Sequence, residues 1–178
     1  MSRRDRQGVG YDDISCRVER NSKEMDILVK SIVDKFCKPL DDYVESISQL
    51  LSDNDKKNIP DEKLDSIVLN LPTLLYFAAN AQESLGIRED MAKSIRNELF
   101  NRVRENSKGT IADKNAAAEL AAMQETLVWS VYQRAYKIVK CKVEGGYELL
   151  ASVKKVISRR SAEYSLSAGV GGQRYEEQ

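Results

Sequence analysis

The apolar residues between positions 129 and 157 recur at alternating steps of three and four, without a single exception. This spacing places them along one stripe of an α-helix, as in a coiled coil, and such a stripe must be covered by another helix. The segment therefore predicts a long helix with one adhesive stripe, which we call the seam. The seam comprises Trp129, Tyr132, Tyr136, Val139, Val143, Gly146, Leu150, Val153 and Ile157.

The helix that carries the seam is expected to be long. Thr110 and Asp113 have the spacing of a capping box, and the helical pattern then continues to about Tyr164. At 1.5 Å per residue, such a helix spans roughly 75–80 Å. The other helices of the chain are expected to be about half as long, so a second copy is expected to cover the rest of the seam. The sequence predicts a homo-oligomer on this basis, and coverage of the seam within one chain is the alternative.

Basic residues cluster on the same segment. Residues 134–160 carry eight basic and two acidic side chains, although the net charge of the whole chain is zero. Lysine and arginine release counterions when they contact nucleic-acid phosphates, and nearby aromatic rings can stack on unpaired bases. A solvated helix face is the alternative, and cations near a helix end also complement its dipole. The candidate nucleic-acid-binding residues are Arg134, Lys137, Lys140, Lys142, Lys154, Lys155, Arg159 and Arg160.

The chain contains no histidine, which removes the most common general base and the most common metal ligand. Its three cysteines are far apart, which favours a reducing compartment over a disulfide framework or a zinc site. We expect no catalytic residue, no metal and no cofactor, and hence a protein that is not an enzyme. The carboxylate pairs Glu144/Glu148 and Glu62/Asp65 leave a metal-dependent nucleotide hydrolase as the weakest alternative.

The patterns along the chain predict one all-α domain between two polar ends. We expect a flexible arm at residues 1–21, an antiparallel domain of about four helices at 22–164, and a disordered tail at 165–178. Signals for β-strands are nearly missing, and Ser22 is a candidate cap for the first helix. Pro39 and Pro72 predict kinks or breaks. The strongly apolar segment 68–79 is expected in the core.

No run of eighteen apolar residues occurs, so no membrane span is expected. The first ten residues carry charge but lack the apolar segment of a secretory signal. These features predict a cytoplasmic protein, located in the host cytoplasm if the chain is viral.

The segment from about Leu71 to Arg160 resembles the phage recombination mediators of the UvsY type. The resemblance rests on helix order and composition. A helix with Tyr-Phe-Ala-Ala-Asn-Ala at 76–81 is followed by a charged helix at 88–104. A long helix with Ala-Tyr-Lys at 135–137 and a basic end comes next. About half of the chain is covered, and the N-terminal part is an extension that the family does not need.

Proteins of this family are small helical homo-oligomers. They bind single-stranded DNA and help to load a recombinase onto strands coated with single-strand-binding protein. The resemblance implies that no residue of this chain is catalytic. It also implies that the best phosphate contacts are Lys137, Lys140, Lys154, Lys155, Arg159 and Arg160.

The favoured hypothesis is a nonenzymatic accessory protein that binds single-stranded DNA, a candidate phage recombination mediator. Its expected partners are single-stranded nucleic acid, further copies of the chain, a recombinase and a single-strand-binding protein. The sequence does not discriminate DNA from RNA. The alternative is a helical structural or protein-interaction module of a virus, either a virion component or an inhibitor of a host protein, that does not bind nucleic acid.

Overall fold

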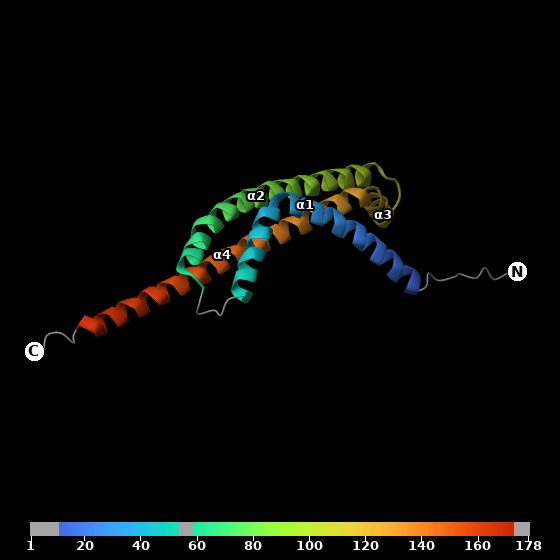
Figure 1. The fold of residues 1–178 in the computed structure, drawn as a ribbon. Helices are drawn as coiled ribbons and strands as arrows, with labels where there is room; N and C mark the ends of the chain where they lie inside the picture. The colour runs from blue at the N-terminus through green and yellow to red at the C-terminus, as the bar shows by residue number, and fades with distance from the viewer. Residues whose placement is uncertain (1–10, 54–58, 173–178) are drawn as a thin grey trace, which may run out of the picture. The chain divides into compact units, whose positions relative to one another are not determined.

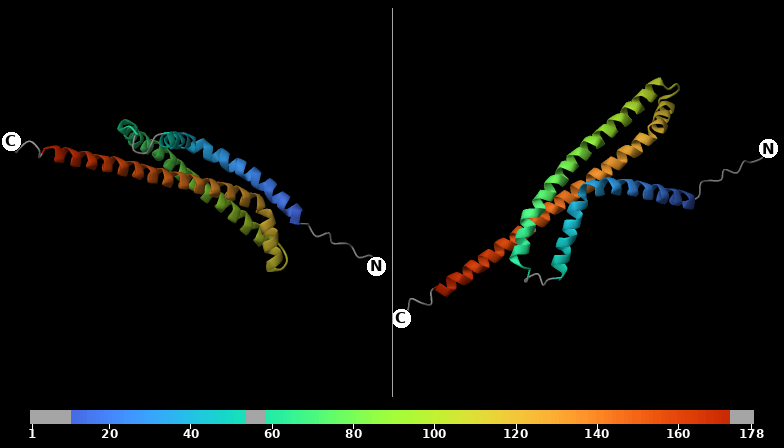
Figure 2. Two further views of the ribbon diagram at one scale, coloured as in Figure 1. Left: turned by 60° about the horizontal axis from the view of Figure 1, so that its bottom comes forward. Right: turned by 45° about the horizontal axis from the view of Figure 1, so that its top comes forward.

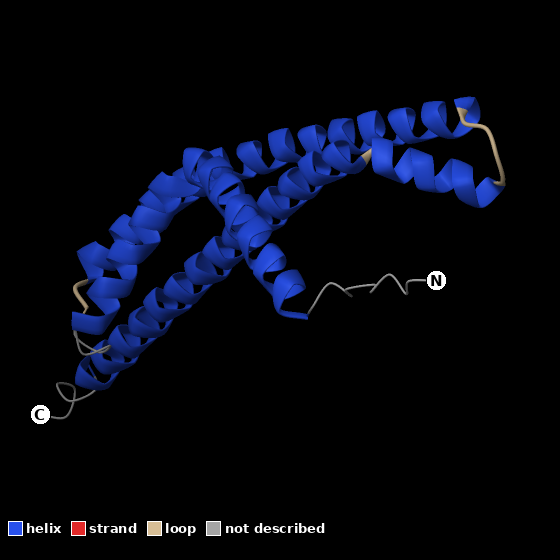
Figure 3. Ribbon diagram, turned by 90° about the vertical axis from the view of Figure 1, so that its right-hand side faces the viewer, coloured by secondary structure: helices blue, strands red, loops and turns tan. Residues whose placement is uncertain are grey.

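The computed structural model describes residues 11–53 and 59–172, with only the backbone described at 11–14, 17, 53 and 168–172. Nearly all of these residues lie in helices, and none of the described residues lies in a strand (Figures 1 and 3). The prediction of an all-α chain with four helices and a long C-terminal helix is therefore confirmed. The helices are α1 (Tyr11–Asp53), α2 (Asp61–Asn106), α3 (Ile111–Ala121) and α4 (Met123–Gly172).

The contacts between these helices divide the chain into two compact units. Unit 1 consists of Met1–Asp34 and Arg88–Ala135, and unit 2 consists of Lys35–Ile87 and Tyr136–Gln178. Each of α1, α2 and α4 therefore contributes one part to each unit, and α3 belongs to unit 1 alone.

Unit 2 contains most of the large buried side chains. Leu71, Leu75 and Leu85 of α2 are completely buried, as are Val139 of α4 and Cys37 of α1. Leu71 and Leu75 are four residues apart, so they lie on the same face of α2. Three helices therefore share one apolar core in this unit.

Gly146 marks a close approach between α4 and α2 in unit 2. A Cβ atom at this position would overlap the side chain of Leu75, which is itself completely buried. The neighbouring Gly145 differs, because no atom lies within 4 Å of the place its Cβ would take. Only the second glycine of the pair is required by the packing.

Unit 1 has a core of small side chains. Apart from Val29 and Val33 of α1, its buried apolar residues are all alanines. An alanine buries much less apolar surface than a leucine, so this core contributes less free energy to folding. Ten larger apolar side chains of the unit are instead exposed by 50% or more. They are Val18, Ile27, Leu28, Met91, Ile95, Ile111, Leu120, Met123, Leu127 and Val128.

Thr110 and Asp113 form the predicted capping box at the start of α3. The Thr110 hydroxyl accepts from the Asp113 N–H, and the Asp113 carboxylate accepts from the Thr110 N–H at 3.0 Å. Hydrogen bonds from the Thr110 side chain and, second, its backbone stabilise the carboxylate and lower the pKa of Asp113.

The single helix predicted from this capping box to about Tyr164 is wrong, because two helices occupy the segment. The backbone leaves the helical conformation at Ala122, where φ is −90° and ψ is 11°, and α4 begins at the next residue. Ala118 and Ala122 are both completely buried, so packing rather than local propensity accounts for the break. The connection at residues 107–110 reverses the chain, so that α3 lies beside the end of α2 (Figure 2).

Helical structure extends further at both ends than the sequence predicted. Because α1 begins at Tyr11, Ser22 lies inside a helix and does not cap it, and only residues 1–10 of the expected arm fall outside the described residues. Similarly, α4 continues to Gly172 and includes the exposed side chains of 161–167. Residues 173–178 of the expected tail lie outside the described residues.

The two prolines lie inside continuous helices, Pro39 in α1 and Pro72 in α2. Neither proline ends a helix, so of the two alternatives predicted at each proline, a kink or a break, the break is excluded. The neighbouring turns of each helix are held by tertiary packing in unit 2, which outweighs the loss of one backbone donor.

The most apolar segment of α2 lies only partly in the core, which corrects the expectation. Leu71 and Leu75 are buried, whereas Leu69, Tyr76 and Phe77 are exposed by 75%, 64% and 63%. Only one face of α2 packs against the other helices here, so apolar residues off that face remain in solvent.

None of the helices described is long and apolar enough to cross a membrane.

The two adjacent glycines provide a matched test of the packing in unit 2. Gly145→Ala should raise the free energy of unfolding by about 0.5–1 kcal/mol, because alanine favours the helix and meets no neighbour. Gly146→Ala gains the same helix propensity but must displace Leu75, which costs about 1–3 kcal/mol. Urea unfolding should therefore rank Gly145→Ala above Gly146→Ala. Equal stabilities would show that α4 does not approach Leu75 this closely.

Candidate nucleic-acid interface

The eight basic residues predicted to bind nucleic acid all lie on α4 but differ in their contacts. Arg134 belongs to unit 1, and the other seven belong to unit 2. Arg134 is exposed and forms no ion pair in the part of the chain that the structure describes. The seven residues in unit 2 form three groups. Two residues pair with an acid outside α4, two pair with an acid along α4, and three have no ion-pair partner among the described residues.

Two of the seven are held by other helices of unit 2. Lys142 forms an ion pair with Asp41 of α1. Arg160 forms an ion pair with Asp61 at the start of α2 and donates to the Ile59 carbonyl at 2.6 Å. Both side chains are partly buried, with relative exposures of 32% and 17%. These cations stabilise the packing of the unit and have little remaining capacity for an external phosphate.

Two further cations form ion pairs along α4 itself. Lys140 lies 3.8 Å from Glu144, and Arg159 lies 2.9 Å from Glu163, each pair separated by four residues. All four side chains are about half exposed or more, and pairs of this kind contribute roughly 0.3–0.5 kcal/mol. A phosphate can therefore replace either carboxylate at small cost.

The remaining three cations of the cluster in unit 2 are uncompensated. Lys137, Lys154 and Lys155 are exposed, and none of them has an ion-pair partner among the described residues. Lys154 and Lys155 are adjacent, so together they form the strongest local excess of positive charge on this part of α4. These three lysines are the most available phosphate contacts of the predicted set.

An exposed aromatic side chain lies between the available cations. Tyr147 is 51% exposed, and Lys140 and Lys154 are each seven residues away along the helix. Seven residues are nearly two full turns, so the three side chains project from one face at intervals of about 10 Å. Aromatic rings near the basic residues were expected to be able to stack on bases, but Tyr147 was not among the predicted nucleic-acid-binding residues. Its spacing of seven from two lysines was the signal that could have identified it.

The seam lies against helices of its own chain. Val139, Val143, Gly146, Leu150 and Val153 are buried within unit 2. The four remaining seam residues, which are Trp129, Tyr132, Tyr136 and Ile157, are partly buried.

Self-association through the seam was predicted because the other helices were expected to be about half as long as the helix that carries it, and this expectation is wrong. α2 has 46 residues and α4 has 50, so α2 is nearly as long as α4. The five buried seam residues are covered within one chain, which is the alternative stated for the seam.

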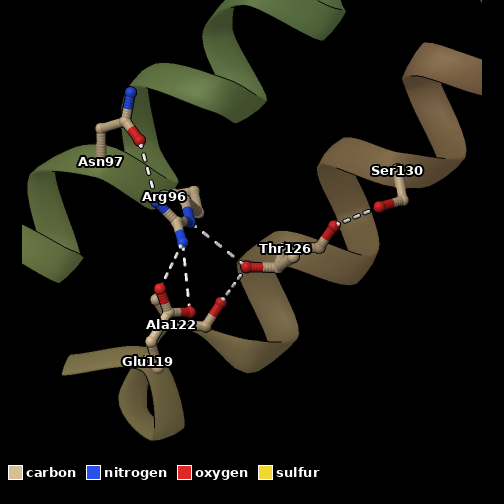
Figure 4. Close-up of polar contacts among 6 residues, drawn as sticks. All are labelled: Arg96, Asn97, Glu119, Ala122, Thr126 and Ser130. Carbon is tan, nitrogen blue, oxygen red and sulfur yellow. Dashed lines mark hydrogen bonds and ion pairs between the residues drawn. The ribbon is translucent and has the colours of Figure 1, made fainter. Parts of the chain in front are cut away.

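In unit 1, Arg96 connects three helical segments (Figure 4). Its guanidinium contacts both carboxylate oxygens of Glu119 in α3 at 3.2 Å and the Thr126 hydroxyl of α4 at 3.3 Å. The Arg96 side chain is only 20% exposed. This polar junction fastens the end of α3 and the start of α4 to α2, which compensates in part for the small apolar core.

A second feature of unit 1 is a pair of unsatisfied polar atoms. The Glu125 Oε2 and Trp129 Nε1 atoms are buried and have no hydrogen-bond partner among the described residues. These residues are four apart, so they lie on the same face of α4. Lys93 of α2 lies over the Trp129 ring, 5.9 Å from its centre.

The carboxylates that suggested a metal-dependent hydrolase are not assembled into a site. Glu144 contacts Lys140, and no group of three potential metal ligands occurs among the described residues. No family model, no curated protein and no solved structure matches this chain.

The contacts of the basic cluster predict different effects on stability. Arg160→Gln should lower the free energy of unfolding by about 1.5–3 kcal/mol, because charge-assisted hydrogen bonds to Ile59 and Asp61 are lost. Lys154→Gln, at an exposed position with no hydrogen bond or ion pair to the described residues, should change it by no more than about 0.5 kcal/mol. Urea midpoints at unchanged m-value measure both effects. A neutral Arg160→Gln would show that this arginine is as available to phosphate as Lys154.

Proposed function

We propose that this chain is a nonenzymatic accessory protein that binds single-stranded nucleic acid along the exposed face of α4 in unit 2. The observation that carries the proposal is the row Lys140–Tyr147–Lys154, in which an exposed ring is flanked on both sides by cations. Lys155 and Lys137 extend the positive charge on the same side of the helix. The charges bind the phosphates, and the ring stacks on an unpaired base.

The composition of this face favours single strands over duplexes. A base in a duplex is already stacked on its neighbours, whereas an unpaired base is free to stack on Tyr147. No side chain of the row has the paired hydrogen-bonding geometry that reads a base edge, so binding is expected to be largely independent of sequence.

The resemblance to the UvsY-type mediators extends the proposal to a cellular role. On this proposal, the protein occupies single strands and promotes the exchange of single-strand-binding protein for a recombinase. Such exchange needs contacts with phosphate that form and break easily. Exposed lysines and weak pairs such as Lys140–Glu144 suit this requirement.

The test compares salt-dependent binding of oligothymidylate by wild-type protein and by variants. The double variant Lys154→Gln/Lys155→Gln should bind more weakly and should flatten the plot of log affinity against log salt by about 1.4, which is two lost contacts to single-stranded phosphates. Tyr147→Ala should weaken binding by about 1–3 kcal/mol at unchanged salt slope, because stacking is lost and the charge is not.

The matched control is Lys23→Gln/Lys30→Gln, which removes the same charge from exposed, unpaired positions on α1. It should retain the wild-type salt slope. Equal effects of the two double variants would mean that the protein attracts nucleic acid only through its general charge and not through a site on α4, and absence of binding at low salt would remove the proposal.

A second candidate function is a helical protein-interaction module, and the apolar surface of unit 1 favours it. Among the described side chains of this unit, ten large apolar ones are exposed, whereas Val29 and Val33 are the apolar residues larger than alanine that are buried. Exposed apolar side chains in such number commonly mark a contact surface. The homo-oligomer expected from the sequence would then use this surface and not the seam.

This candidate is tested by molar mass. Met123 and Leu127 are one turn apart on α4 and are exposed by 56% and 52%. If unit 1 mediates assembly, Met123→Gln/Leu127→Gln should shift the mass measured by light scattering towards that of one chain. The control Leu69→Gln/Phe77→Gln, at exposed apolar positions of unit 2, should not. A monomeric wild-type protein would exclude self-association as the role of this surface.

A further inference from the structure

The end of α2 and the start of α3 border an open surface cavity of about 360 Å³ in unit 1. Asn101, Arg104 and Glu105 line it from the last two turns of α2, and Ile111 and Lys114 line it from the first turn of α3. The cavity forms because α3 folds back beside the end of α2 (Figure 2). Its volume lies within the range of small-ligand sites, roughly 300–1,000 Å³.

Two cations in this cavity have no counterion. Neither Arg104 nor Lys114 forms an ion pair with any of the described residues, and this includes Glu105 in the same cavity. Arg104 and Lys114 approach from different helices, so both can contact one ligand from two directions. The lining has a net positive charge, because two cations face one carboxylate.

The position of Lys114 is unfavourable without an anion. It lies in the first turn of α3, where the positive end of the helix dipole disfavours a cation. Asp113 in the same turn already accepts hydrogen bonds from the hydroxyl and the N–H of Thr110. An anion between Lys114 and Arg104 would offset the repulsion that the folded chain itself leaves uncompensated.

We propose that this cavity binds the phosphate group of a phosphate ester. The Arg104 guanidinium offers two parallel N–H donors that match phosphate oxygens, Lys114 adds a point charge, and Asn101 adds an amide donor. Ile111 is 75% exposed and gives the cavity an apolar wall against which a sugar or a base can pack. Glu105 can accept a hydrogen bond from a sugar hydroxyl, which favours an ester over free inorganic phosphate.

Two sources share this chemistry, a free nucleotide and the phosphodiester of a nucleic-acid strand. The cavity lies in unit 1 and the α4 row lies in unit 2, so the two sites involve different residues. The proposal does not depend on the α4 row, and its failure is distinguishable from failure of that site.

The experiment titrates the full chain with adenosine 5′-monophosphate, adenosine and a short oligothymidylate, and follows the Ile111 methyl signals by NMR and affinity by calorimetry. Adenosine monophosphate or the oligothymidylate should shift Ile111, and adenosine should not. Arg104→Gln and Lys114→Gln should each weaken binding roughly tenfold, which is one lost charge-assisted contact. Glu105→Gln should tighten it.

The matched control is Arg102→Gln, an exposed position near the end of α2 that does not line the cavity. It should leave the affinity nearly unchanged, as should Lys154→Gln/Lys155→Gln for adenosine monophosphate. Arg104→Lys retains the charge but loses the paired donors, so it should lie between wild type and Arg104→Gln. Circular dichroism verifies that each variant is folded.

The outcomes separate the sources of phosphate. Binding of adenosine monophosphate that depends on Arg104 assigns the cavity to nucleotides. Binding of the oligothymidylate alone, with the same dependence, assigns it to a strand. The proposal is overturned if neither probe shifts Ile111 at low salt, or if Arg102→Gln weakens binding as much as Arg104→Gln.

Discussion

The packing of Leu75 against Gly146 is the contact on which the arrangement of unit 2 depends. Because position 146 has no Cβ, α4 approaches α2 closely enough for its apolar stripe to enter the core of its own chain. The stripe is then enclosed by α1 and α2, and the opposite face of α4 is left to solvent. Tyr147 and Lys154 directly follow Gly146 and Val153, so they lie about 100° round the helix from these residues, at the edge of the stripe, and both are exposed.

The same packing also determines which cations are available. Lys142 and Arg160 flank the buried stripe, so each meets an acid from a neighbouring helix, Asp41 or Asp61. Lys154 and Lys155 point about 120–140° away from Lys142 and Arg160 round the helix, and neither has an ion-pair partner among the described residues. The direction in which each basic side chain leaves α4 therefore decides whether it pairs with an acid of a neighbouring helix or stays available to a ligand. Only the cations that stay available support the proposed function.

The sequence predicted those features that depend on spacing alone. The period of three and four placed α4 and its buried face correctly, and the Thr110–Asp113 pair marked the start of α3. The break at Ala122 was not predictable in this way, because alanine is the strongest helix former and only tertiary packing explains the turn. The Lys142–Asp41 pair joins residues that are 101 positions apart, and no local pattern reports such a contact.

Residues 161–167 at the end of α4 have exposed side chains, so backbone hydrogen bonds and local contacts such as the Arg159–Glu163 ion pair maintain this part of the helix without tertiary packing. Isolated helical turns are marginally stable in water, and unwinding starts at a free end. Opening that begins near Gly172 meets its first tertiary obstacle at Arg160, which is tied to Ile59 and Asp61. The arginine thus divides α4 into a segment whose amide protons exchange with solvent readily and a segment protected by the fold.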